Sequence, residues 1–308
     1  MKAYSNPGGL FAALMAIIII FISASLYEAG LISDDLYLRL ISVIEKETVT
    51  EHYDLEVHFI DVGQSESILI KAPDKNILID AGEIGYGNDI TNYLRSKGVF
   101  AIDIFIATHP HSDHIGSASH ILKKFPVAEV ILPEIPVEYL PTTDLYRDLL
   151  LSLKKENCLV SYAEVGKTYD LGSGAVLEIL SPSGDFGENL NNYSIASKLS
   201  FGEVSFLFTG DIEAEAEEAI LSSGADISCT VYNAGHHGSS TSNTSAFLDA
   251  ASPEYAAVSC GRNNDYGHPH REIVSEFKER NITCFRTDYD GSIIFGSDGK
   301  DIFIKTSK

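Results

Sequence analysis

The sequence predicts an α/β domain in which two β-sheets pack face to face and helices cover their outer faces. Short apolar runs rich in Val, Ile and Leu recur in both halves of the chain, separated by Gly, Pro and Asp. Helical patterns follow the strands within each half, and elements that are apolar on one face must bury that face against another layer. No short-period repeat is visible, which argues against a solenoid or a propeller.

The individual elements follow from these patterns in chain order. In the first half, strands are predicted at residues 55–61, 67–71, 76–80, 103–107 and 127–132, and helices at 88–97, 115–124 and 145–156. In the second half, strands are predicted at residues 175–180, 195–201, 204–208, 230–233, 255–259, 283–286 and 292–295, and helices at 213–221, 245–251 and 271–280. The chain thus offers enough strands for two sheets.

A hydrophobic segment precedes this domain. Residues 3–27 carry no charged side chain, and residues 10–22 are apolar without a break. With its flanks the segment reaches the ~20 residues needed to cross a bilayer. A cleaved signal peptide is the alternative, because the small residues 23–25 would suit a cleavage site. The apolar positions that continue beyond Leu26 favour an anchor.

The charges around this segment predict its orientation. Lys2 precedes it, whereas Glu28, Asp34 and Asp35 follow it, so the positive-inside bias places the body of the protein outside the cytoplasm. We therefore expect a transmembrane anchor or signal segment at residues 1–28 and a short helix and linker at 29–54. The folded domain itself is expected at residues 55–308.

Composition limits the partners and the redox chemistry. The formal net charge of −22 disfavours a general nucleic-acid coat or a protein of anionic lipid surfaces, but not the cleavage of a phosphodiester in a metal-lined cleft. The four cysteines form no Cys-x-x-Cys pair and are expected to be buried small apolar residues. The sequence does not decide whether they form disulfides, and no cysteine metal site is indicated.

The strongest local signal is a cluster of metal-binding residue types between a predicted strand and a predicted helix. His109, His111, Asp113 and His114 fall within six residues, a pattern expected by chance on the order of once in a thousand such chains. His109 and His111 alternate along an extended backbone, so both rings can hold one ion. Asp113 and His114 can hold a second ion about 3.5 to 4 Å away, and two such ions activate a shared water.

Further candidate ligands follow other predicted strands. Asp211 ends an apolar strand after a glycine and can bridge two cations, although it could instead cap the following helix. His236 and His237 point in different directions, so one would bind metal while the other contacts the substrate or transfers a proton. His268 is a further ligand candidate, with a structural role at a helix entry as its alternative. N/O ligation of this kind suits Zn²⁺, Mn²⁺ or Fe.

An ordered set of motifs resembles a known family. The set consists of Phe59-Ile60-Asp61-Val62-Gly63-Gln64, Leu78-Ile79-Asp80-Ala81-Gly82, the cluster at 109–114, Thr209-Gly210-Asp211, His236-His237-Gly238-Ser239 and Tyr266-Gly267-His268-Pro269. It is similar to the metallo-β-lactamase superfamily, in particular to the branch that includes the C-terminal domain of the DNA-uptake protein ComEC. The resemblance covers about residue 55 to the last residue and implies a four-layer αββα sandwich.

The resemblance also implies roles for the site residues. His109 and His111 would bind the first ion, Asp113 and His114 the second, and Asp211 would bridge them. His236 and His268 are assigned to complete the metal shells, and His237 and Asp113 to act in catalysis. Asp61 and Asp80 would lie beside the ligands and orient them.

Two departures from the family pattern limit what carries over. The family continues after Gly63-Gln64 with Gly-Asp-Ser, whereas this chain has Ser65-Glu66-Ser67, which keeps the acid but loses the glycine. The chain has one hydrophobic segment and no polytopic bundle, so DNA uptake does not carry over.

The predicted function is a metal-dependent hydrolase that activates water with two divalent ions, Zn²⁺ in the first place and Mn²⁺ as the alternative. A phosphodiester is the expected substrate, either a small or cell-envelope molecule or a single-stranded nucleic acid, and the acidic charge favours the former. Ester, thioester or lactam hydrolysis at the same ions is the second hypothesis. A non-catalytic, metal-containing surface module is the third. No obligate protein partner is inferred.

Overall fold

The computed structural model describes residues 53–156 and 158–308, together with residues 27, 32 and 33. The chain separates into two units, Met1–His52 and Tyr53–Lys308. The predicted hydrophobic segment, short helix and linker lie outside the described residues, apart from single positions. Within the described part, no helix is both long and apolar enough to cross a membrane. The second unit contains both sheets and the candidate site.

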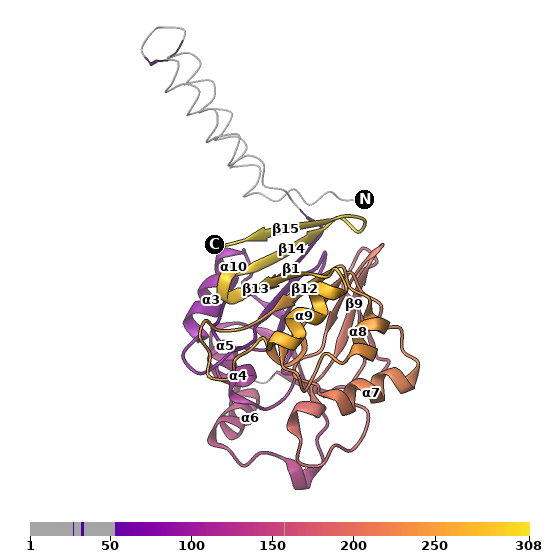
Figure 1. Ribbon diagram of the computed structural model, residues 1–308. Coiled ribbons are helices and arrows are strands. Elements are labelled where there is room, and N and C mark those ends of the chain that lie inside the picture. Colours follow the sequence, from indigo (N-terminus) through magenta and orange to yellow (C-terminus); the bar gives the residue numbers. More distant parts are fainter. Residues whose placement is uncertain (1–26, 28–31, 34–52, 157) are drawn as a thin grey trace. The chain divides into compact units, whose positions relative to one another are not determined.

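The described strands form two sheets (Figure 1). The eight-stranded sheet has the order β15 (Ile302–Thr306), β14 (Ile293–Ser297), β1 (Leu55–Phe59), β2 (Ile68–Lys71), β3 (Asn76–Ile79), β4 (Ile102–Ile106), β5 (Val127–Leu132) and β6 (Leu159–Tyr162). The seven-stranded sheet has the order β13 (Thr283–Arg286), β12 (Tyr255–Val258), β11 (Val231–Asn233), β10 (Val204–Phe208), β9 (Ser197–Phe201), β8 (Val176–Ile179) and β7 (Thr168–Asp170). Both sheets are mixed: β3 to β6 run parallel in the first and β10 to β13 in the second.

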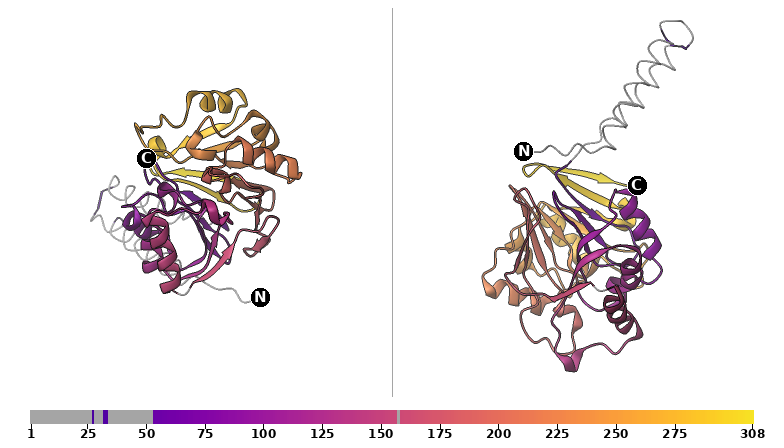
Figure 2. Two further views of the ribbon diagram at one scale, coloured as in Figure 1. Left: turned by 90° about the horizontal axis from the view of Figure 1, so that it is seen from below. Right: turned by 180° about the vertical axis from the view of Figure 1, so that it is seen from behind.

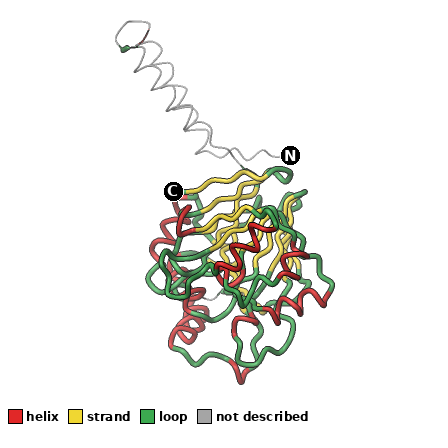
Figure 3. The backbone as a smooth tube through the Cα atoms, in the orientation of Figure 1, coloured by secondary structure: helices red, strands yellow, loops and turns green. Residues whose placement is uncertain are grey.

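Helices cover the outer face of each sheet, as Figure 2 shows from two further sides and Figure 3 by secondary structure. The described α-helices are α3 (Gly87–Ser96), α4 (Ser112–Ile115), α5 (Ala118–Lys124), α6 (Asp144–Glu156), α7 (Ala214–Ser223), α8 (Ser245–Ala251), α9 (Arg271–Glu279) and α10 (Thr287–Asp290). Short 3₁₀ turns lie at η1 (Val137–Tyr139), η2 (Leu190–Tyr193) and η3 (Gly235–Gly238). This arrangement confirms the predicted pair of packed sheets with helices outside.

Three apolar clusters correspond to the three interfaces between the four layers. The cluster between the sheets includes Val57, Ile68, Leu177, Phe206 and Phe295. A second cluster joins the first sheet to α3, α5 and α6 and includes Leu78, Phe105, Ile90, Leu94 and Ile121. A third joins the second sheet to α7, α8 and α9 and includes Leu207, Tyr232, Ile220, Phe247 and Phe277. Since apolar burial is the main favourable term in folding, these interfaces fix the positions of the strand ends that carry the site.

Most predicted elements are present, with one correction of substance. The helix predicted at residues 115–124 is wrong in extent, because the segment forms two helices, α4 and α5, separated at Gly116 and Ser117. The Ser117 amide donates to Gly82 O at 3.2 Å and its hydroxyl to Glu83 O at 2.7 Å, so the helical hydrogen-bond ladder is interrupted there. The structure adds strands β6, β7 and β15 and helix α10, which the sequence patterns did not indicate.

Candidate metal centre

The histidine cluster occupies the loop after β4 and the single-turn helix α4. His111 has an extended backbone (φ −86°, ψ 156°) directly before α4, so the chain changes direction between His111 and Asp113. His109 and His114 are fully buried, while Asp113 is partly exposed to the pocket. The short helix therefore turns Asp113 and His114 toward the same space that the extended residues before it reach.

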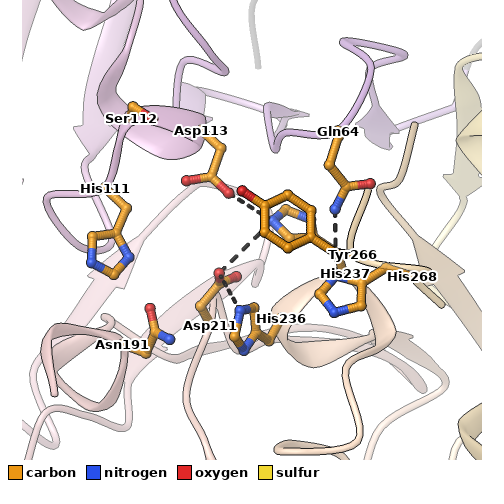
Figure 4. A pocket seen from close by; sticks show the side chains of 10 residues that line it. All are labelled: Gln64, His111, Ser112, Asp113, Asn191, Asp211, His236, His237, Tyr266 and His268. Atoms are coloured by element: carbon orange, nitrogen blue, oxygen red, sulfur yellow. Dashed lines mark hydrogen bonds and ion pairs between the residues drawn. The ribbon is translucent and has the colours of Figure 1, made fainter. Parts of the chain in front are cut away.

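Four side chains from three parts of the chain bring ligand atoms together at this loop. Asp113, His114, Asp211 and His237 each offer one such atom, and the four atoms lie within 4.8 Å of one another. His114 Nε2 lies 3.2 Å from Asp211 Oδ1, and His237 Nε2 lies 3.2 Å from Asp113 Oδ2. Asp113, Asp211 and His237 point toward one another in Figure 4. Asp211 follows β10 and His237 follows β11, so the group joins both sheets.

A second set of nitrogens lies beside this group. His109 Nε2 and His111 Nδ1 are 2.9 Å apart, and His109 Nε2 lies 4.0 Å from Asp211 Oδ2. Asn191, from η2, lines the pocket close to His111. Asp211 is thus the carboxylate that reaches both sets of imidazoles.

Buried partners orient the imidazole rings of the first group. His114 Nδ1 donates to Asp80 Oδ2 at 2.6 Å, and Asp80 also accepts from the amide and hydroxyl of Thr108 at 2.8 and 2.7 Å. His237 Nδ1 donates to Ser259 O at 2.8 Å. Because each ring is bonded through Nδ1, its Nε2 atom is left to face the carboxylates, which is how metal-binding histidines are usually held.

The remaining predicted histidines lie outside this four-residue group. His236 is partly exposed, with Nε2 3.6 Å from Asp211 Oδ2 and Nδ1 3.5 Å from Glu213 Oε1. His268 accepts a hydrogen bond at Nδ1 from Gln64 Nε2 at 3.4 Å, and its ring stacks on the exposed Tyr266 ring at 5.6 Å. Of these three histidines, His237 belongs to the group of four ligand atoms, while His236 Nε2 lies beside Asp211 and His268 lies beside His236 and His237.

Of the two aspartates predicted beside the metals, one contacts a candidate ligand and the other lies elsewhere. Asp80 bonds His114 directly. The side chain of Asp61 forms an ion pair with Lys308 Nζ at 2.8 Å, and its backbone amide donates to Ser292. Asp61 therefore stabilises the end of the sheet beside β14 and β15, and its side chain does not orient a candidate ligand.

These residues line an open pocket of about 290 Å³. Its lining consists of Gln64, His111, Ser112, Asp113, Asn191, Asp211, His236, His237, Tyr266 and His268 (Figure 4). The lining mixes candidate ligands with neutral polar and aromatic groups, since Asn191 lies close to His111 and the His268 ring centroid lies 5.5 Å from that of His236. A substrate in this pocket could therefore contact candidate ligands and hydrogen-bonding groups together.

The charges of the site favour ionised carboxylates. Burial opposes ionisation of Asp211, but the charges of His114 and His237 outweigh it and hold the pKa of Asp211 well below its usual range. Burial lowers the pKa of His237, yet the Asp211 charge and the hydrogen bond to Asp113 raise it to about 9. Burial lowers the pKa of His109, which keeps its ring neutral. The negative carboxylates thus keep the imidazoles of His114 and His237 protonated, and a bound cation would displace these protons.

Glu66 is a buried acid whose role the sequence left undefined. It is 2% exposed, its Oε2 accepts from Asn233 Nδ2 at 2.9 Å, and its Oε1 is buried without a hydrogen-bond partner among the described residues. Its carboxylate also lies with Asp80 and His114 in a buried group of acidic and imidazole atoms. Burial raises the pKa of Glu66 to about 7. The only signal in the sequence was the acid kept at this position of the family motif.

We predict that Glu66→Gln removes a pH-dependent loss of folding stability that the buried Glu66 carboxylate causes in the metal-free protein. The folded pKa of about 7 exceeds the ordinary glutamate value of 4.5, so folded protein holds this proton more tightly than unfolded protein. The proton on Glu66 contributes about 3 kcal/mol to the free energy of unfolding. This contribution is fully present below pH ~4.5 and is lost as the pH rises through ~7. In urea unfolding of chelator-treated protein, the variant should match the parent near pH 5 and exceed it by about that amount at pH 8.

The exposed Glu138→Gln is the control for this measurement, and it should leave the free energy of unfolding unchanged at both pH values. A difference between Glu66→Gln and the parent that stays constant from pH 5 to pH 8 would contradict the role assigned to the buried carboxyl.

The donor set fits a cation. His114 Nε2 is buried and forms no well-aligned hydrogen bond with the described residues, and it faces Asp211 Oδ1 at 3.2 Å as an ion pair. A buried ring nitrogen without a well-aligned hydrogen bond costs free energy, which a bound cation would offset. Imidazole and carboxylate donors are the ligands of Zn²⁺, Mn²⁺ and Fe in proteins. The residues present therefore suit a dinuclear metal site, and they do not choose among these metals.

Comparison with known proteins agrees with this geometry. The model of the metallo-beta-lactamase superfamily matches residues 60–262. The chain is 29% identical over 256 residues to ComE operon protein 3 of Bacillus subtilis strain 168, a match that covers 77% of this chain and 32% of that protein. It is 29% identical over 238 residues to competence protein ComA of Neisseria gonorrhoeae, covering 77% of this chain and 31% of that protein. The chain thus spans about a third of the length of these curated relatives.

A solved structure shares the fold. CmlA, a diiron β-hydroxylase from Streptomyces venezuelae, superposes with a TM-score of 0.51 at 16% sequence identity. The superposition covers 82% of this chain and 57% of that chain. At this identity the similarity concerns the fold alone.

Proposed function

The chain belongs to the metallo-β-lactamase superfamily of metallohydrolases, and from this premise we propose that it is a phosphodiesterase with a dinuclear metal site. The observation that carries the proposal is the convergence of four ligand atoms, from Asp113, His114, Asp211 and His237, on the wall of an open pocket. The similarity to ComEC-family competence proteins supports a phosphodiester substrate.

We assign the ligands as follows. Asp113, His114, Asp211 and His237 would hold one ion, because their ligand atoms lie together. His109 and His111 would hold the other, with Asp211 shared between the two. Bound there, two divalent cations would lower the pKa of a water molecule and neutralise charge on the attacked phosphoryl group.

The residues of the chain have separate tasks in this proposal. Asp113, ionised and partly exposed to the pocket, would orient the attacking water through its carboxylate. His236 faces the pocket from outside the ligand group and would donate a proton from Nε2 to the leaving oxygen. Gln64 and His268, joined by a hydrogen bond and with the His268 ring beside that of His237, would hold the substrate against the ligands. Burial, and then the charges of His237 and His236, lower the pKa of His268 to about 4, so it would bind as a neutral group.

We also propose that the domain acts outside the cytoplasm. The apolar run at residues 10–22, with Lys2 before it and acidic residues after it, supports this location. The net charge of −22 supports a small or cell-envelope phosphodiester over long anionic polymers, with a single-stranded nucleic acid as the alternative substrate. Protease digestion of intact cells and of lysed cells tests the location, and digestion only after lysis would refute it.

The function is tested by metal analysis of the purified full chain together with hydrolysis of bis(p-nitrophenyl) phosphate. We expect two divalent ions per chain and turnover that a chelator abolishes and the metal restores. His111→Ala, which removes a candidate ligand at the surface of the site, should abolish turnover.

Other outcomes would favour the other classes. Hydrolysis of a chromogenic lactam, or of p-nitrophenyl acetate, without hydrolysis of the phosphodiester would assign the site to lactams or esters. Bound metal with no turnover of any of these substrates would favour a non-catalytic module.

A further inference from the structure

The turn that carries His237 has an unusual backbone. His236, His237 and Gly238 have φ values of 51°, 55° and 79° in succession, so three consecutive residues lie in the left-handed region. For residues other than glycine this conformation is strained. Such a conformation persists only where the surrounding structure holds it, and here it sets the direction of the His237 ring.

The side chain of Asn243 spans this turn. Its Oδ1 accepts from Gly235 N at 3.0 Å and from the Tyr232 hydroxyl at 2.9 Å. Its Nδ2 donates to Gly235 O at 2.9 Å and to Ser239 O at 3.0 Å. Asn243 is 2% exposed. One buried amide group is therefore bonded to both ends of the strained turn, which fixes the separation between those ends.

Asn243 is itself fixed by a buried acid. Glu217, on α7, is completely buried, and its two carboxylate oxygens accept from the backbone amides of Asn243 at 2.6 Å and Thr244 at 2.9 Å. Asn243 also has a left-handed backbone, with φ 63°, a conformation that asparagine and aspartate adopt more readily than other side chains. Glu217 therefore holds the backbone from which the amide reaches the turn.

The same segment reaches the other candidate ligand loop. The Ser242 hydroxyl donates to Ile212 O at 2.7 Å, and the Ala214 amide donates to Thr241 O at 3.0 Å. Ile212 directly follows Asp211. The segment at residues 241–244 thus ties the loop of the shared carboxylate to the turn of His237.

We propose that Asn243, held by Glu217, is a positioning residue for the metal site, and that its amide sets the position of His237 relative to Asp211 and Asp113. The inference rests on the ligand role proposed for His237. Both functions of the amide are needed, because Oδ1 accepts from a backbone amide while Nδ2 donates to two carbonyls. An aspartate at 243 would keep the size and the acceptor but would place a charge against two carbonyl oxygens.

Asn243→Asp tests the proposal with metal affinity as the readout. Titration with Zn²⁺ against a chromophoric chelator should show that one of two ions binds about 10- to 100-fold more weakly, a loss typical of residues that orient metal ligands. Asn281→Asp is the matched control, since Asn281 is exposed and also left-handed, with φ 59°. The control should bind both ions as the parent does.

A second variant separates positioning from general loss of structure. Glu217→Gln keeps one acceptor oxygen and should weaken the same ion less than Asn243→Asp does. For both variants, circular dichroism of the metal-free protein at 25 °C should retain the parent spectrum. Selective weakening of one ion supports the positioning role whether or not the parent cleaves phosphodiesters. Two ions bound by Asn243→Asp with parental affinity would overturn it, even in an active phosphodiesterase.

Discussion

Asp211→Asn is expected to lower kcat/KM for bis(p-nitrophenyl) phosphate by about a thousandfold or more and to reduce the metal content of the purified protein. The Asp211 carboxylate lies 3.2, 3.8 and 4.0 Å from the Nε2 atoms of His114, His237 and His109, so it is the group shared by both sets of imidazoles. Asparagine keeps its shape but removes the charge that would bridge two cations. Several kcal/mol of transition-state stabilisation depend on such ions, and about 4 kcal/mol corresponds to a factor of about a thousand.

Metal analysis and steady-state kinetics on the same preparation test this expectation. Asp144→Asn is the control, because Asp144 pairs with Arg147 at the surface and its side chain is 83% exposed. That variant should keep the metal content and the kinetics of the parent. If Asp211→Asn retained two ions and parental turnover, the shared carboxylate would have no part in the site.

The largest expected effect on stability is that of Phe295→Ala, which should lower the free energy of unfolding by about 3 to 5 kcal/mol. Phe295 belongs to the first sheet and is fully buried. Its ring centroid lies 5.8 Å from that of Phe59 in the same sheet, and 6.4, 6.1 and 5.9 Å from those of Phe206, Tyr255 and Phe285 in the opposite sheet. Removing this ring leaves a cavity at the interface that joins the two sheets, and surrounding rings cannot all move to fill it.

Urea and thermal unfolding followed by circular dichroism measure the loss. For a domain of this size the thermal midpoint should fall by about 10 °C. Phe100→Ala, at a ring that is 69% exposed, should change the free energy of unfolding by less than about 0.5 kcal/mol. Equal effects of the two substitutions would mean that the contact between the sheets does not depend on this aromatic cluster.

The sequence predicted the strands of the fold best where an apolar run lies between turn residues. Strands β5 and β10 were predicted with their observed bounds, because their apolar runs are bounded by turn residues. The edge strands β6 and β15 were not predicted, although their sequences LVSY and IFIKT are largely apolar, and most of their residues are exposed or half-exposed. Their pairing with β5 and β14 is decided by tertiary contacts that no local pattern contains.

The candidate site was predictable in its members but not in their arrangement. The loop at residues 109–114 and Asp211 are short polar motifs at strand ends, and such positions are visible in a sequence. Which of His236 and His237 joins the ligand atoms depends on two consecutive left-handed residues, whereas the sequence alone predicts an extended pair. That conformation depends on Asn243, which lies six residues beyond His237 and has no metal-binding chemistry of its own. Asp61 belongs to the family motif at residues 59–64, yet its carboxylate pairs with Lys308 near the last strand.

The position of β1 between β2 and β14 has a consequence for how the protein is made. Leu55 pairs with Ser297, so one edge of the earliest strand stays without its neighbour until almost the whole domain has left the ribosome. A nascent chain that already carries the histidine loop would expose this apolar edge, which can pair with other chains. We therefore expect chaperones that shield strand edges to act on the growing polypeptide, and cation uptake to follow translation, because the carboxylate and imidazole from the second sheet emerge late.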